Sequence, residues 1–186
     1  MPDDDIRETC GECGFDAAHW EREPLSSQVR GLAEEWTLLV ASVEPARMRE
    51  RPQPEVWSPL EYTVHTARIV EYWVDAAAAL ARGEKLSMDK ESYPDADHLP
   101  FNGVAIATAS DDLFSQLVRL AAWNDAASEE ELAAPLRMTD ATLESMWHRL
   151  GVRDAAAALR HAVHDAAHHL GDIERQQTAR RRAEET

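Results

Sequence analysis

The stretch "WSPLEYTVHTARIVEYWVDAAAALARG", residues 57–83, carries the clearest structural signal in the chain. Ser58 is a preferred N-cap residue, Pro59 suits the first helical position, and Glu61 completes a capping box three residues after the cap. Gly83 follows the alanine run and is a typical helix end, because glycine adopts positive φ angles without steric cost. These signals predict a long helix between Ser58 and Gly83.

On both sides of this helix, apolar residues recur at spacings of three and four, without the regular alternation of a strand. Further long helices are expected over about 26–49, 110–126 and 152–179. Pro52 and Pro54 should end the first of these, and Asp111 and Asp112 should lie in the first turn of the second. Short helices are expected from 128 and over about 143–150. Four long helices predict an all-α four-helix bundle, in which metal sites are built from facing helices.

Size and charge limit the partners of the chain. Its 186 residues suffice for one domain, here the bundle over 25–186, preceded by an N-terminal extension over 1–24. The formal net charge of −16 argues against a nucleic-acid partner. The sequence contains no run of about 18 apolar residues, so no membrane span is predicted. The acidic first residues do not resemble a signal peptide. A cytoplasmic location is therefore expected, and two cysteines rule out a disulfide framework.

The stretch "HAVHDAAHHL", residues 161–170, holds four of the eight histidines. Residues four apart lie on one helix face, so His161 with Asp165, His164 with His168, and Asp165 with His169 could each contribute two ligands to one metal ion. The apolar stripe of the expected helix passes closest to Asp165 and His169. A metal inside the bundle therefore favours this pair, and the HxxxH pair formed by His164 and His168 is the alternative.

A catalytic zinc ion normally has three protein ligands and a water molecule. His65 is the obvious third candidate, because it lies between Val64 and Ile69 in a well-capped amphipathic helix where an exposed histidine would be unexpected. The structural alternative is a core histidine that bonds to a neighbouring helix.

Trp57-Ser58-Pro59 leading to His65, followed by "HDAAHHLGD" at 164–172, resembles the DinB-like superfamily over about residues 26–178. The similarity is greatest to its actinobacterial branch, which includes mycothiol-dependent maleylpyruvate isomerases and bacillithiol or mycothiol S-transferases. The resemblance implies an up-down-down-up bundle whose metal ligands are His65, Asp165 and His169. The chain departs from the family pattern at Asp165, where His or Glu is usual, and this leaves His164 or His168 as substitutes.

The resemblance also implies an activity. In such enzymes a divalent metal, commonly zinc or nickel, binds a low-molecular-weight thiol such as mycothiol and favours its thiolate, which attacks a small electrophilic substrate. A thiol-dependent transferase or isomerase is therefore expected. The alternatives are a non-catalytic metal-binding or sensing protein and a metal-dependent hydrolase. No membrane partner is expected, and a homodimer is left open.

The stretch "CGECGF", residues 10–15, contains half of a common zinc motif. A mixed site with His19 or His98, a redox-active pair, and two free thiols in a mobile tail are all compatible with it. In a further variant, Cys10 or Cys13 reaches the metal of the helix bundle.

Residues 84–109 lack helical periodicity, and they contain "YPDADHLP" with Asp97 and His98. A long connection of this kind is often a functional loop or lid, which would bring these two side chains near the site. The alternative is a solvated acidic connection.

Overall fold

The structure is a computed structural model that describes residues 8–20, 22–88 and 99–185. Its long helices are α1 (Arg22–Ser42), α2 (Pro59–Ala81), α3 (Ile106–Ala126) and α6 (Ala155–Glu184). The short ones are α4 (Glu129–Leu132), α5 (Ala141–Arg149) and the 3-10 turns η2 (Ala17–His19), η3 (Arg47–Arg49) and η4 (Phe101–Gly103). Within the described residues there are isolated bridges but no strands, so the expected all-α class is confirmed.

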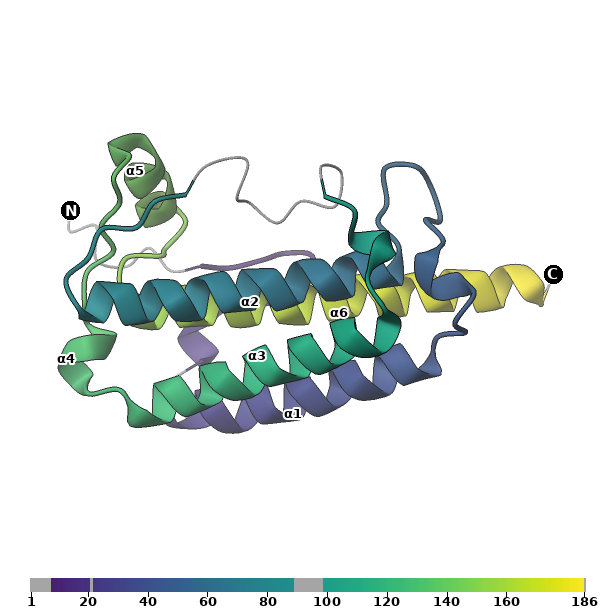
Figure 1. Cartoon of the computed structure of the whole chain (residues 1–186), viewed down its shortest axis with the longest axis horizontal. Coiled ribbons are helices and arrows are strands. Elements are labelled where there is room, and N and C mark those ends of the chain that lie inside the picture. Colours follow the sequence, from purple (N-terminus) through teal and green to yellow (C-terminus); the bar gives the residue numbers. More distant parts are fainter. Residues whose placement is uncertain (1–7, 21, 89–98, 186) are drawn as a thin grey trace.

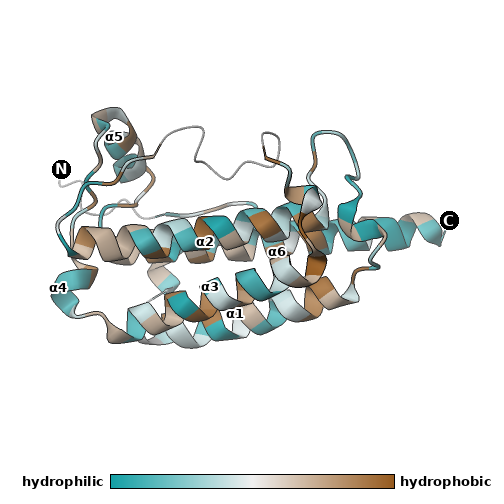
Figure 2. Cartoon of the chain, viewed as in Figure 1, coloured by the Kyte–Doolittle hydropathy of each residue, from teal (hydrophilic) through white to brown (hydrophobic). Residues whose placement is uncertain are grey.

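The four long helices pack side by side around one hydrophobic core (Figure 1). Helix α2 contacts α3 and α6, and α1 contacts the other faces of the same two helices. In Figure 1, α1 and α6 run in one direction and α2 and α3 in the other. The last turns of α6 extend past the other helices and are hydrophilic (Figure 2). No helix in the described segments is long and apolar enough to cross a membrane.

The start of α2 matches the prediction in detail. Ser58 Oγ accepts a hydrogen bond from the Glu61 N–H at 3.2 Å, and Glu61 Oε2 accepts one from the Ser58 N–H at 2.8 Å. Burial raises the pKa of Glu61, but hydrogen bonds from Arg51 and Ser58 outweigh this and hold it below its usual range. Gly83, just after the helix, has a φ of +77°, as its position predicted. Local capping chemistry therefore defines both ends of the helix that carries His65.

Replacing Ser58 by alanine should lower the free energy of unfolding by about 1–2 kcal/mol. The buried hydroxyl caps α2 and also donates to Asn102 Oδ1 at 2.9 Å, so its loss removes the partner of the buried Glu61 N–H and of the half-buried Asn102 Oδ1. Urea denaturation measures the change. The control is Ser128→Ala, which removes the equivalent cap from the exposed, four-residue α4 and should cost less than about 0.5 kcal/mol, because water replaces the cap there. Equal losses in the two variants would contradict the prediction.

Several expected helix boundaries were wrong. Helix α1 begins at Arg22 and ends at Ser42, well before residue 49, because Pro45 has no N–H and its ring clashes with the preceding helical turn. Only the separate turn η3 follows it. Helix α3 begins at Ile106, so Asp111 and Asp112 lie beyond its first turn. The last four residues of the expected loop 84–109 are therefore helical.

The remaining boundaries are close to the prediction. Ser128 caps α4 as expected, and Asp140 caps α5. Helix α6 begins after its N-cap Asp154, whose side chain accepts from the Ala157 N–H at 2.7 Å, and it continues five residues beyond 179. The histidines of residues 161–170 therefore occupy the second, third and fourth turns of a single long helix.

Candidate metal sites

His65 on α2 and His169 on α6 face each other where these two helices pack. His65 is only 4% exposed, and the two imidazole ring centroids lie 5.0 Å apart in an edge-on arrangement. Two aromatic rings stand beside this pair: Trp57 lies 4.9 Å from His65, and Tyr62 lies 5.0 Å from His169, both measured between ring centroids. The helix pair thus brings together two histidines that are far apart in the sequence, in a largely aromatic surrounding.

Asp172 determines which nitrogen of His169 is left for other partners. Its Oδ2 lies 2.8 Å from His169 Nδ1, and its Oδ1 accepts from Arg175 at 2.5 Å. Burial raises the pKa of Asp172, but the bonds to His169 and Arg175 outweigh this and lower it, so the carboxylate is ionised and can only accept. Nδ1 of His169 therefore donates, and Nε2 carries the lone pair that a metal would use.

The separation of the two rings is compatible with a divalent metal ion between them. With metal–nitrogen bonds of about 2.0–2.1 Å and tetrahedral angles, two imidazoles on one ion have ring centroids roughly 5 Å apart. The pair His65 and His169 has this separation. A carboxylate on the other nitrogen of a ligating histidine is the usual outer partner in such sites.

The third predicted ligand, Asp165, lies beside a different histidine. Asp165 Oδ2 lies 3.8 Å from His161 Nε2, on the preceding turn. In the described part of the chain, groups whose ligand atoms all lie within 4.8 Å of one another combine His168, His169 and Asp172; Glu8, His161 and His164; or Cys10, Cys13, His164 and His168. Neither His65 nor Asp165 belongs to any of them. A metal triad of His65, Asp165 and His169 therefore stays a prediction.

Comparison with known families identifies the chain. The DinB superfamily family model matches residues 28–173, which include both His65 and His169. The chain belongs to the DinB superfamily. Metal dependence is general in this superfamily, and the donor groups above are compatible with it. No curated protein and no solved structure matches the chain.

Residues 8–20, which precede the DinB match, lie along α6 and contact His161, His164 and His168. Glu8 Oε1 contacts Nδ1 of His161 at 2.6 Å and Nδ1 of His164 at 2.5 Å. The Phe15 ring stacks on His164 with 4.5 Å between centroids. A helical wheel alone assigns this face to solvent, since it cannot show a second segment packed against it. Sequence reasoning missed Glu8, and no motif marks it.

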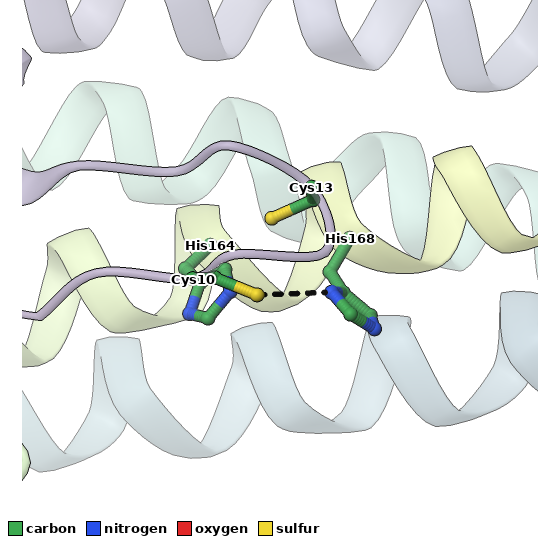
Figure 3. A group of neighbouring side chains, drawn as sticks. All are labelled: Cys10, Cys13, His164 and His168. Carbon is green, nitrogen blue, oxygen red and sulfur yellow. Dashed lines mark hydrogen bonds between the residues drawn. The ribbon is translucent and has the colours of Figure 1, made fainter.

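This DinB chain also brings its two cysteines to the HxxxH pair. Cys10 Sγ lies 3.7 Å from His168 Nδ1, and Cys13 and His164 complete the cluster (Figure 3). The two cysteines do not form a disulfide. His19, one of the expected additional ligands, is instead exposed beside Asp16 at 4.0 Å and is not part of the cluster. His98 and Asp97 lie outside the described residues.

The cluster has an unusual protonation pattern for thiols. A hydrogen bond from the Cys13 backbone lowers the pKa of Cys10 to about 6, whereas burial raises the pKa of Cys13. Burial lowers the pKa of His164, but Glu8 and Cys10 outweigh this and raise it to about 9. At neutral pH this DinB protein therefore places the Cys10 sulfur, which readily forms a thiolate, beside the cationic imidazole of His164.

Proposed function

We propose that this DinB protein is a metal-dependent transferase or isomerase that uses a low-molecular-weight thiol of the mycothiol type as its nucleophile. The observation that carries the proposal is the pair of buried His65 and half-buried His169, which meet across α2 and α6 with Asp172 on the outer nitrogen of His169. A bound zinc or nickel ion would favour the thiolate form of the thiol. The substrate would be a small electrophile, as in the actinobacterial branch that the sequence resembles.

Each residue of the site has a distinct task in this proposal. His65 and His169 hold the ion, with Asp165 as third ligand and His164 or His168 as the alternatives. Asp165 lies one helical turn before His169, so it is on the same side of α6. In the fold that we propose, the four long helices form an up-down-down-up bundle, and this pair points into it.

The aromatic residues shape the surroundings of the reaction. Trp57 and Tyr62 lie against the two histidines and limit the access of water. Burial, together with the nearby charge of Asp172, raises the pKa of Tyr62 to about 12. Its hydroxyl therefore stays protonated at neutral pH and is able to donate a hydrogen bond to a substrate oxygen.

The test is a thiol-transfer assay with the full chain. The protein is loaded with zinc or nickel and incubated with several small thiols, mycothiol among them, and monobromobimane. We expect the parent protein to react faster than the uncatalysed mixture. In His169→Ala the rate should fall by at least about 100-fold, and the variant should lose one equivalent of bound metal. His19→Ala is the control, because this exposed histidine lies outside the site. No acceleration with any thiol, or an unchanged His169→Ala, would overturn the proposal.

The same assay separates the competing functions. Metal content that depends on His169 without any thiol reaction would favour a binding or sensing protein. Ester hydrolysis that needs the metal but no thiol would favour a hydrolase. The cytoplasmic location, a homodimer and the division into an extension over 1–24 and a bundle over 25–186 stay predictions.

A further inference from the structure

We propose that Cys10, Cys13, His164 and His168 form a second metal site, suited to zinc, that fastens the segment 8–20 to α6. All four ligand atoms lie within 4.8 Å of one another. The site is separate from the proposed catalytic set of His65, Asp165 and His169, because none of these three residues belongs to it.

The cysteines are presented by a closed turn. The Gly14 N–H donates to the Cys10 carbonyl at 2.9 Å, and the Cys10 N–H donates to the Phe15 carbonyl at 2.9 Å. Gly14 has a φ of +74°, which a residue with a side chain would rarely adopt. Phe15 is buried next to this turn and stacks on the His164 ring. Both sulfurs are therefore held on one side of a turn that is anchored to α6.

The distances suit a tetrahedral zinc ion. With a zinc–sulfur bond of about 2.3 Å and a zinc–nitrogen bond of about 2.0–2.1 Å, a sulfur and a nitrogen on one ion lie roughly 3.6 Å apart. Cys10 Sγ and His168 Nδ1 are separated by 3.7 Å. His164 and His168 are four residues apart on α6, with ring centroids 5.8 Å apart. Figure 3 shows the four side chains gathered between the N-terminal turn and the helix.

His164 is oriented as a metal ligand would be. Glu8 engages its Nδ1 at 2.5 Å, which leaves Nε2 for another partner. This Nε2 is buried and has no hydrogen-bond partner among the described residues. A buried ring nitrogen of this kind is costly unless it is satisfied, and a carboxylate on the opposite nitrogen is the usual outer partner of a zinc-bound histidine. A metal ion between His164 and the thiols would satisfy it.

His168 is arranged in the opposite sense. Its Nδ1 faces Cys10, while its Nε2 lies 3.7 Å from Asp172 Oδ2 and 3.6 Å from Glu12 Oε2. Each imidazole therefore has a carboxylate near the ring nitrogen that faces away from the thiols. These carboxylates favour the binding of a cation at the other ring nitrogen. Asp172 also holds His169, so one carboxylate lies between the second site and the histidine pair of α2 and α6.

The donor set indicates both the metal and the role. Two thiolates and two imidazoles in a tetrahedral arrangement select zinc, and four protein ligands leave no open position for a substrate. The site is therefore structural. It joins residues 8–20 to a helix that begins far along the chain, and it keeps the histidine face of α6 covered.

Cobalt provides the test, because thiolate ligands give a thiolate-to-cobalt charge-transfer absorption that imidazole and carboxylate ligands do not. The full chain is reduced, stripped of metal and titrated with Co²⁺ without oxygen. We expect one equivalent to produce this absorption together with the intense visible bands of tetrahedral cobalt, and zinc to remove both. Neither signal requires enzymatic activity.

The variants assign the ligands. Cys13→Ser and His164→Ala should each weaken cobalt and zinc binding at this site by more than about 100-fold, since loss of an outer partner alone costs 10–100-fold. His169→Ala and His19→Ala should keep the full charge-transfer absorption, and circular dichroism confirms that each variant is helical. Absence of this absorption in the reduced parent, or its persistence in Cys13→Ser, would overturn the site. A cysteine pair that forms a disulfide and takes up no metal after reduction would also overturn it.

Discussion

Trp36→Ala is expected to lower the free energy of unfolding by about 3–5 kcal/mol. Trp36 is 2% exposed on α1, and its indole N–H donates to the carbonyl of Ala166 on α6 at 3.0 Å. The substitution removes a large buried side chain and leaves a cavity where these two helices meet. It also removes the donor of a buried hydrogen bond. The accepting residue lies between His164 and His168 in the sequence, within the part of α6 that carries the candidate metal ligands.

Urea denaturation followed by circular dichroism measures this loss. Leu38→Ala is the matched control, because Leu38 lies on the same helix but is 71% exposed, and it should change the free energy of unfolding by less than about 0.5 kcal/mol. Trp36→Phe should fall between the two, since it keeps most of the apolar volume but loses the hydrogen bond. If Trp36→Ala unfolds at the same urea concentration as Leu38→Ala, the assigned packing is wrong.

Asp172→Asn is expected to weaken metal binding at the histidine pair by about 10–100-fold. The ionised carboxylate accepts from His169 Nδ1 and makes Nε2 a stronger ligand. The amide has almost the same shape but no charge, so it orients the ring less firmly and no longer raises its basicity. The helix should remain intact, because the substitution alters a partly exposed position without creating a cavity.

Competition with a coloured chelator measures the affinity. The experiment uses a Cys10→Ser/Cys13→Ser background, in which only the site at His65 and His169 should bind tightly. Glu174→Gln, an exposed acidic neighbour on α6, is the control for the loss of one negative charge. An Asp172→Asn affinity equal to that of the control would show that this carboxylate does not support His169.

The sequence could predict the elements whose signals are local. The capping box of α2, the stop at Gly83 and the spacing of apolar residues depend on contacts within a few positions, so they were read correctly. The helical spacing of apolar residues also placed His169 at the edge of the apolar stripe. In the structure its ring lies next to that of His65. Boundaries such as that of α1 were less predictable, because helical periodicity continues through a segment in which Pro45 blocks the helix.

The sites depended on information that no local pattern contains. The spacing of Asp165 and His169 suggested a ligand pair, but the contact to His169 comes from Asp172, one turn later. The choice among neighbouring acidic residues depends on rotamers and on Arg175, which holds Asp172 in place.

By itself, the sequence determined an all-α chain with a capped helix around His65, a helix rich in histidines and a cysteine turn, because capping and periodicity act over short distances. Only the tertiary structure decided that the cysteine turn lies on His164 and His168. The two parts are more than 150 residues apart, and the HxxxH pair alone indicates a solvated face as readily as a metal site. The N-terminal segment covers that face because Phe15 and Glu8 pack against it, and such contacts arise only after the helices have assembled.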